Sequence, residues 1–185
     1  MAIGSGNKVA PTSTVLQARV MLYQPSKIPV FQQGEWFKTS FGECRVSGRL
    51  GQRHADVMEG MLFVAEAKRE ERDGGVEILV DKARLRRTLS GSKFSYDQLE
   101  KLIEELRSAT VTIKAPQFDS PIIGGLIDHV VPSPMTRPNP LNGGERHLWR
   151  VRLGVVLVML LEHDLSLHYS PMPIARLRFG ITKAI

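Results

Sequence analysis

The sequence predicts an α+β fold in which residues 76–114 run in the order strand, helix, tight turn, helix, strand. Three observations support this order. Alternating apolar residues follow a glycine pair, Ser95 and Gln98 have the spacing of a capping box, and a β-branched run ends the unit at Thr110–Ile113. The order is typical of a winged helix-turn-helix core.

The first half of this unit is a short strand followed by a short helix. Val76, Ile78 and Val80 occupy alternate positions, which is the period of a half-buried strand. Asp81 then stands where an N-cap residue belongs. Lys82–Leu89 carries good helix formers until a Ser-Gly-Ser sequence ends the helix.

The second helix has a clearly marked start. Ser95 and Gln98 can each satisfy a backbone N–H of the first turn, while Phe94 and Leu99 hold the positions of a hydrophobic staple. Apolar residues then recur at helical spacing, which predicts one buried face made of Leu99, Leu102, Ile103 and Leu106.

Two further elements are predicted before this unit. Lys27–Gly48 is rich in aromatic and β-branched residues broken by two glycines, which favours one or two hairpins packed on the core. Gln52–Arg72 is the best long helix of the sequence, with the following glycine pair as its end. Val15–Tyr23 fits a short strand extension or an extended segment.

A β-hairpin, the wing, is predicted after the unit. Ile122–Val131 is extended and apolar, and the proline-rich segment Pro132–Gly144 is predicted to be a loop. Arg146–Leu153 alternates, which places His147, Trp149, Val151 and Leu153 on one face and Arg146, Arg150 and Arg152 on the other. Val155–Leu167 fits a buried helix or strand equally well.

These elements give a domain organisation of three parts. Residues 1–26 form a flexible leader, and residues 27–170 form the winged-helix domain with its extended wing. Residues 171–185 begin a helix without a stop signal, so we expect a linker helix toward a second domain that is missing here; its apolar positions are Ile174, Leu177, Ile181 and Ile185.

Composition favours an anionic partner. The chain has 185 residues, 42% of them hydrophobic, and a net charge of +6, so nucleic acid is the first expectation and a membrane surface the second. The single cysteine, Cys44, excludes an internal disulfide framework and fits a reducing cytoplasm. The longest apolar run, Val155–Leu161, is far shorter than the roughly 20 residues of a membrane-spanning helix.

Basic residues gather on the first helix of the unit and on the turn after it. Within twelve residues and without an intervening carboxylate stand Lys82, Arg84, Arg86, Arg87 and Lys93. In a winged helix this region lies beside the DNA backbone, where such side chains neutralise phosphates. The same pattern also fits the solvated side of an amphipathic helix, and both interpretations remain open.

The second helix is a poor candidate for reading bases. Its exposed side carries mostly carboxylates, which phosphates would repel: Asp97, Glu100, Glu104 and Glu105. We therefore expect it to touch DNA only through its first turn, or to face a protein partner; the first-turn residues are Ser92, Lys93, Ser95 and Tyr96. Arg146, Arg150 and Arg152 can reach DNA from the wing, or form a charged edge that blocks aggregation.

Signatures of catalysis are weak throughout the sequence. His54 and Asp56 are two residues apart and point in different directions on a helix. His163 and His168 lack the spacing that aligns two imidazoles on one helix face, and Cys44 stands in no nucleophile motif. No glycine-rich loop precedes a Lys-Ser or Lys-Thr pair. We therefore expect no enzyme activity, no metal and no cofactor.

Together these elements resemble the first winged-helix domain of plasmid replication initiator (Rep) proteins. The family pattern is carried in order by Val76–Val80, Arg84–Leu89 and Tyr96–Leu106, and the similarity spans Leu50–Leu167. The resemblance implies two winged-helix domains, of which the second reads repeated origin sites and the first contributes backbone contacts, dimerisation or both. The chain departs from that pattern in lacking the second domain and in its long proline-rich wing tip.

The expected function is therefore binding of plasmid origin DNA by a non-catalytic replication initiator in the cytoplasm. The expected partners are double-stranded DNA, a second copy of the chain in a homodimer, and host replication proteins. Two alternatives remain open at this point, namely a winged-helix transcriptional regulator and a dimerisation module that does not touch DNA.

Overall fold

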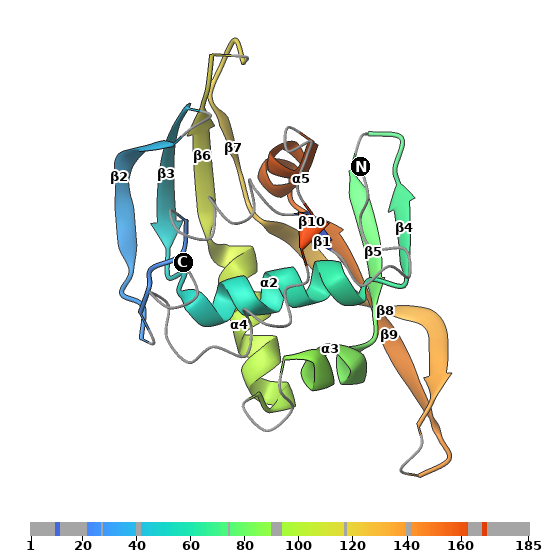
Figure 1. The fold of residues 1–185 in the computed structure, drawn as a ribbon. Helices are drawn as coiled ribbons and strands as arrows, with labels where there is room; N and C mark the ends of the chain where they lie inside the picture. Colours follow the sequence, from blue (N-terminus) through green and yellow to red (C-terminus); the bar gives the residue numbers. More distant parts are fainter. Residues whose placement is uncertain are drawn as a thin grey trace.

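The protein has an α+β fold in which the central helix α2 (Gln52–Val64) lies between two antiparallel sheets (Figure 1). The computed structural model describes residues 10–11, 22–26, 28–39, 42–73, 75–89, 94–116, 118–139, 142–162 and 168–169. The rest of the expected leader and the expected helix at 171–185 lie outside these residues. The predicted α+β class is confirmed.

The first sheet has the strand order β2-β3-β6-β7. Its members are β2 (Gln32–Thr39), β3 (Gly42–Gly48), β6 (Thr110–Lys114) and β7 (Ile122–Gly124). Strands β2 and β3 are the hairpin predicted within Lys27–Gly48. Cys44 and Val46 of β3 face the core together with Val111 and Ile113 of β6, because these pairs stand directly opposite each other.

The second sheet has the strand order β4-β5-β9-β8. Its members are β4 (Ala67–Glu70), β5 (Val76–Val80), β9 (Glu145–Leu153) and β8 (Ile127–Pro138). β8 and β9 form a long hairpin that projects away from the core (Figure 1). A separate pair joins β1 (Ala10–Pro11) to β10 (His168–Tyr169).

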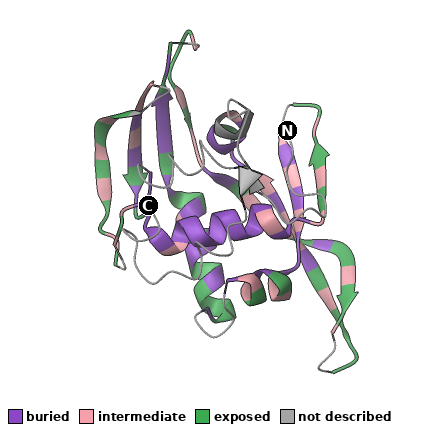
Figure 2. Cartoon of the chain, viewed as in Figure 1, coloured by how far each residue is buried: buried purple, intermediate pink, exposed green. Residues whose placement is uncertain are grey.

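Helix α2 is buried on nearly every side, and 11 of its 13 residues are buried (Figure 2). It is covered by α3 (Lys82–Thr88) and α4 (Tyr96–Ser108) as well as by the sheets. Gly60 lies very close to α3, since a Cβ atom there would be 2.9 Å from side-chain carbons of both Leu85 on α3 and Leu89 at its C-cap. The absence of a side chain therefore sets the spacing between α2 and α3.

Both helices of the central unit begin as predicted. The Asp81 carboxylate accepts a hydrogen bond from the Ala83 N–H at 2.9 Å and caps α3. Ser95 and Gln98 form the capping box of α4, with both hydrogen bonds at 3.1 Å. The predicted face of α4 is buried, and each of its four apolar side chains contributes about 1.5–3 kcal/mol.

The predicted long helix is wrong in its second half. Helix α2 ends at Val64, and the charged residues after it form β4 instead of continuing to Arg72. Strand β4 pairs with β5, the next strand along the chain, with Ala67 opposite Leu79 and Glu70 opposite Val76, so its backbone hydrogen bonds are satisfied within a hairpin. The charged residues of β4 fit a helical pattern equally well, and that pattern does not record the hairpin pairing.

The predicted loop at Pro132–Gly144 is also wrong over its first half, because β8 continues to Pro138. Proline is tolerated there since β8 is the outer strand of its sheet and needs no hydrogen bonds on its free side. A register shift between Pro132 and Thr136 accommodates the irregular backbone. In the connection to β9, Gly143 has φ +68°, a conformation that favours glycine.

After the hairpin the chain returns to the core as helix α5 (Val155–Glu162). Of the two structures that the sequence allowed for this segment, helix and strand, the helix is therefore the one that forms. The return passes through a tight crossing of two backbones. A Cβ atom on Gly154 would lie 2.0 Å from the carbonyl oxygen of Gly125, at the point where the chain leaves β7 for β8. Only glycine allows that approach.

Candidate nucleic-acid interface

The four basic residues predicted on the first helix lie on α3, where α3 packs beside the first turn of α4. We call Lys82, Arg84, Arg86, Arg87 and Tyr96 the basic corner. Lys82 and Arg86 are one helical turn apart, and both lie over the ring of Tyr96, at 5.2 Å and 4.9 Å from its centroid. The aromatic ring therefore holds two of the four cations by cation–π contacts.

Lys82 also joins the corner to the hairpin. Its ammonium lies 4.9 Å from the ring centroid of Trp149 on β9 and donates a hydrogen bond of 2.7 Å to the Glu100 carboxylate on α4. One side chain thus contacts two aromatic rings and one carboxylate that come from different elements. Sequence reasoning placed Lys82 in the cluster but gave no sign of Trp149 beside it.

Arg84 and Arg87 have a different environment. Both are exposed, and within the described part of the chain neither lies in an ion pair with a carboxylate. Two cations on an exposed surface, separated by one helical turn, can contact successive phosphates of a nucleic-acid backbone. Ser92 and Lys93, predicted to extend this surface, lie outside the described residues.

The hairpin arginines do not join the basic corner. Arg150 lies 3.3 Å from the Glu77 carboxylate, and Arg152 pairs with Asp73 and lies 3.5 Å from Asp128. As predicted, they share the outer face of the sheet, opposite Glu77 and Leu79 of β5. The hydrogen bond to Asp73 raises the pKa of Arg152.

Arg146, the third predicted hairpin arginine, reaches back to the start of α3. Its guanidinium donates two hydrogen bonds to Asp81, from Nε to Oδ1 at 3.2 Å and from Nη2 to Oδ2 at 2.7 Å. Burial tends to raise the pKa of Asp81, but the hydrogen bonds from Arg146 and from the Ala83 N–H outweigh it and lower the pKa.

Helix α4 carries the acidic surface that was predicted, with one exception. Asp97, Glu100 and Glu104 are exposed, whereas Glu105 is partly buried against α2. There its carboxylate lies 2.7 Å from Nε2 of His54. No local sequence pattern indicates this pair, because 51 residues separate its members.

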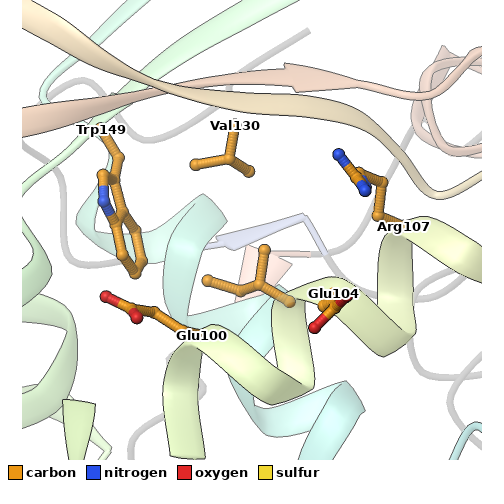
Figure 3. Close-up of a pocket in the computed structure, with 6 residues that line it drawn as sticks. Glu100, Glu104, Arg107, Val130 and Trp149 are labelled. Atoms are coloured by element: carbon orange, nitrogen blue, oxygen red, sulfur yellow. The ribbon is translucent and has the colours of Figure 1, made fainter. Parts of the chain in front are cut away.

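A cavity of about 300 Å³ lies between α4 and the hairpin (Figure 3). It is lined by side chains of both elements: Glu100, Ile103, Glu104, Arg107, Val130 and Trp149. Trp149 and Val130 face the helix across the cavity (Figure 3). Its charged walls carry both signs, with two glutamates beside Arg107, so the cavity offers no uniformly positive surface to a polyanion.

No protein family model matches the chain, and no curated protein matches it. Two solved structures match its fold. A crystal structure of RctB domains 2 and 3 (RctB-155-483) aligns with TM-score 0.50 and 10% identity over 84% of this chain and 62% of that chain. A crystal structure of selenomethionine derivatives of the same domains aligns with TM-score 0.54 and 10% identity over 93% of this chain and 68% of that chain.

The chain is similar in fold to RctB domains 2 and 3. At 10% identity, that similarity concerns the fold alone. The chain spans 62% of the first of these structures, so it corresponds to part of that two-domain unit.

Three observations bear on other kinds of site. Cys44 is buried in β3. The described residues hold no group of three potential metal ligands, although His163 and Asp164 lie outside them. None of the helices in the described ranges has the length and apolar content needed to cross a bilayer.

Proposed function

We propose that this chain is a non-catalytic DNA-binding domain of a plasmid replication initiator, built as a winged helix-turn-helix. RctB, whose domains 2 and 3 share its fold, is a replication initiator. The observation that carries the proposal is the basic corner, where Arg84 and Arg87 are exposed on a helix that packs beside a long β-hairpin. DNA is the expected partner of such a surface.

The order of elements supports the winged-helix interpretation. Helix α2, strand β5, helices α3 and α4 and the hairpin β8–β9 follow one another in the order of that motif. The hairpin lies next to α3, because its strand β9 pairs with β5 and β5 leads directly into α3. Strand β6 departs from the minimal motif, since it belongs to the other sheet.

The charge distribution favours contact with phosphates over reading of bases. Exposed carboxylates on α4 oppose its insertion into a groove, whereas α3 presents cations. We infer that phosphate contacts come from Lys82, Arg84, Arg86 and Arg87 on α3, from Tyr96 on α4 and from Arg150 and Arg152 on the hairpin. Ser92 and Lys93, which lie outside the described residues, remain predicted contacts from the sequence.

A separate surface supports the proposed homodimer. Strand β2 is the outer strand of the first sheet, and large apolar side chains are exposed along it and just before it: Ile28, Val30, Phe31 and Trp36. An open edge with exposed apolar residues is suited to pairing with the same strand of a second copy. This surface is distinct from the basic corner, so one chain can use both.

The test is binding to a short fluorescein-labelled duplex of mixed sequence, followed by anisotropy over a series of salt concentrations. Affinity should fall steeply with salt, and the double variant Arg84→Glu/Arg87→Glu should reduce the slope of log K against log salt by about 1.8. The matched control is Arg69→Glu/Arg72→Glu, which makes the same charge change where β4 turns into β5, at the opposite end of β5 from α3. Binding that is independent of salt, or equal losses in both double variants, would overturn the proposal.

A further inference from the structure

Asp81 lies at the junction of β5 and α3 and is only 4% exposed. Its carboxylate has two roles at once, since it caps α3 through the Ala83 N–H and accepts two hydrogen bonds from Arg146. A buried carboxylate is stable only when its oxygens are satisfied and its charge is balanced, and Arg146 supplies the balancing charge.

Arg146 is engaged on its other side as well. Its Nη1 donates a hydrogen bond of 2.6 Å to the carbonyl oxygen of Pro138, which lies on β8 at the far end of the hairpin. The guanidinium therefore connects both strands of the hairpin to Asp81, the N-cap residue of α3. A second link between the same hairpin and the core is the ion pair of Arg137 with Glu66.

This geometry leaves Arg146 poorly placed to bind a phosphate. Three of its nitrogen atoms already donate to protein oxygens. Transfer of the guanidinium to DNA would leave the Asp81 charge buried without a partner, which is strongly unfavourable. The hydrogen bond to Asp81 also raises the pKa of Arg146, as expected for a preserved ion pair.

We propose that Asp81 and Arg146 form a positioning pair, which fixes the hairpin β8–β9 relative to the basic corner and leaves phosphate contact to other residues. This inference rests on the proposed function, because it assigns a role to the pair within DNA binding. It changes the role of Arg146 from a phosphate ligand to a residue that acts through Asp81.

The two roles predict opposite effects of neutralising Asp81. If Arg146 bound phosphate, Asp81→Asn would release a competing carboxylate and strengthen DNA binding. If the pair positions the hairpin, the same substitution loosens the hairpin and weakens binding, between about twofold and thirtyfold. Asparagine retains the helix cap, so α3 itself is preserved in this variant.

The experiment measures the full chain and its Asp81→Asn, Arg146→Met and double variants on the same labelled duplex. We expect similar losses in all three and a salt slope equal to that of the unsubstituted chain, because no phosphate contact is removed. Tighter binding by Asp81→Asn, or a slope reduced by about 1 in Arg146→Met alone, would overturn the inference.

A second measurement does not depend on DNA. Amide hydrogen exchange should accelerate in the β8–β9 hairpin beyond Pro132 in each variant, and it should stay unchanged in α4. Unchanged exchange in the hairpin would overturn the inference even if DNA binding fell. Arg146→Lys, which keeps the charge but loses the paired hydrogen bonds, should reproduce the faster exchange if Asp81→Asn does not fold. If the unsubstituted chain binds no DNA, the proposed function is wrong. The hydrogen-exchange result still tests whether Asp81 and Arg146 fix the position of the hairpin.

Discussion

The Nε2 atom of His54 on α2 lies 2.7 Å from a carboxylate oxygen of Glu105 on α4. The Nδ1 atom of the same ring accepts a hydrogen bond of 2.9 Å from the Gly51 N–H, so the neutral ring donates from Nε2 to Glu105. This arrangement links the start of the central helix to the acidic helix through one nearly inaccessible imidazole, which is only 2% exposed.

His54 should make stability depend on pH. Burial lowers the pKa of His54 below its ordinary value of 6.5, and it outweighs the opposing effect of Glu105. The unfolded chain therefore binds a proton at a higher pH than the folded chain does. The free energy of unfolding should decrease as pH falls below about 6.5 and level off once it passes the folded-state pKa. His54→Gln should flatten this part of the curve in urea denaturation; an unchanged slope would contradict the prediction.

Gly60→Ala should destabilise the fold, although glycine to alanine within a helix normally stabilises it. The new methyl group would lie 2.9 Å from side-chain carbons of Leu85 and Leu89, which costs roughly 1–3 kcal/mol in a packed core. The measurement is the shift in thermal midpoint. In a Leu89→Ala variant the added methyl group has more space, so Gly60→Ala should cost less free energy of unfolding there. An unchanged cost would show that contact with Leu89 is not its cause.

Glu100→Gln should strengthen DNA binding under the proposed function. The substitution removes a carboxylate from the edge of the basic corner and releases the Lys82 ammonium from its 2.7 Å hydrogen bond. An effect of roughly 0.5–1 kcal/mol is expected for a partly exposed ion pair. Glu104→Gln is the matched control, because it removes the same charge from α4 at a residue that does not contact Lys82. Equal gains in the two variants would show that only net charge matters.

Trp36→Lys should dissociate the proposed homodimer. Trp36 is 46% exposed on β2, and its ring lies 4.9 Å from the Arg45 guanidinium, so a lysine would add repulsion where an apolar contact is expected. Sedimentation velocity should show a monomer for Trp36→Lys and a dimer for Trp36→Phe, which keeps an aromatic ring. If the two variants sediment with the same mass, β2 is not part of the dimer interface.

Features set by neighbouring residues could be predicted from the sequence. The caps at Asp81 and Ser95 and the buried face of α4 depend on residues within a few positions of one another, and the structure confirms them. The basic cluster was found for the same reason. Its exposed members, Arg84 and Arg87, remain predicted DNA contacts.

Features set by pairing between elements could not be predicted. Residues 67–70 look helical by composition, yet hairpin pairing with the following strand β5 makes them a strand. The prolines of β8 predict a loop, but an outer strand tolerates them. The partners of His54 and Arg146 lie 51 and 65 residues away, and no local pattern records such contacts.

The prolines of β8 have one more consequence. The two large sheets have four outer strands in the described part of the chain, and three of them are poor templates: β7 and β4 are short, and β8 lacks backbone donors at its prolines. In a dimer joined through β2, the long, open outer strand of each molecule would be covered by its partner. Growth into a filament would then have no strand left from which to continue.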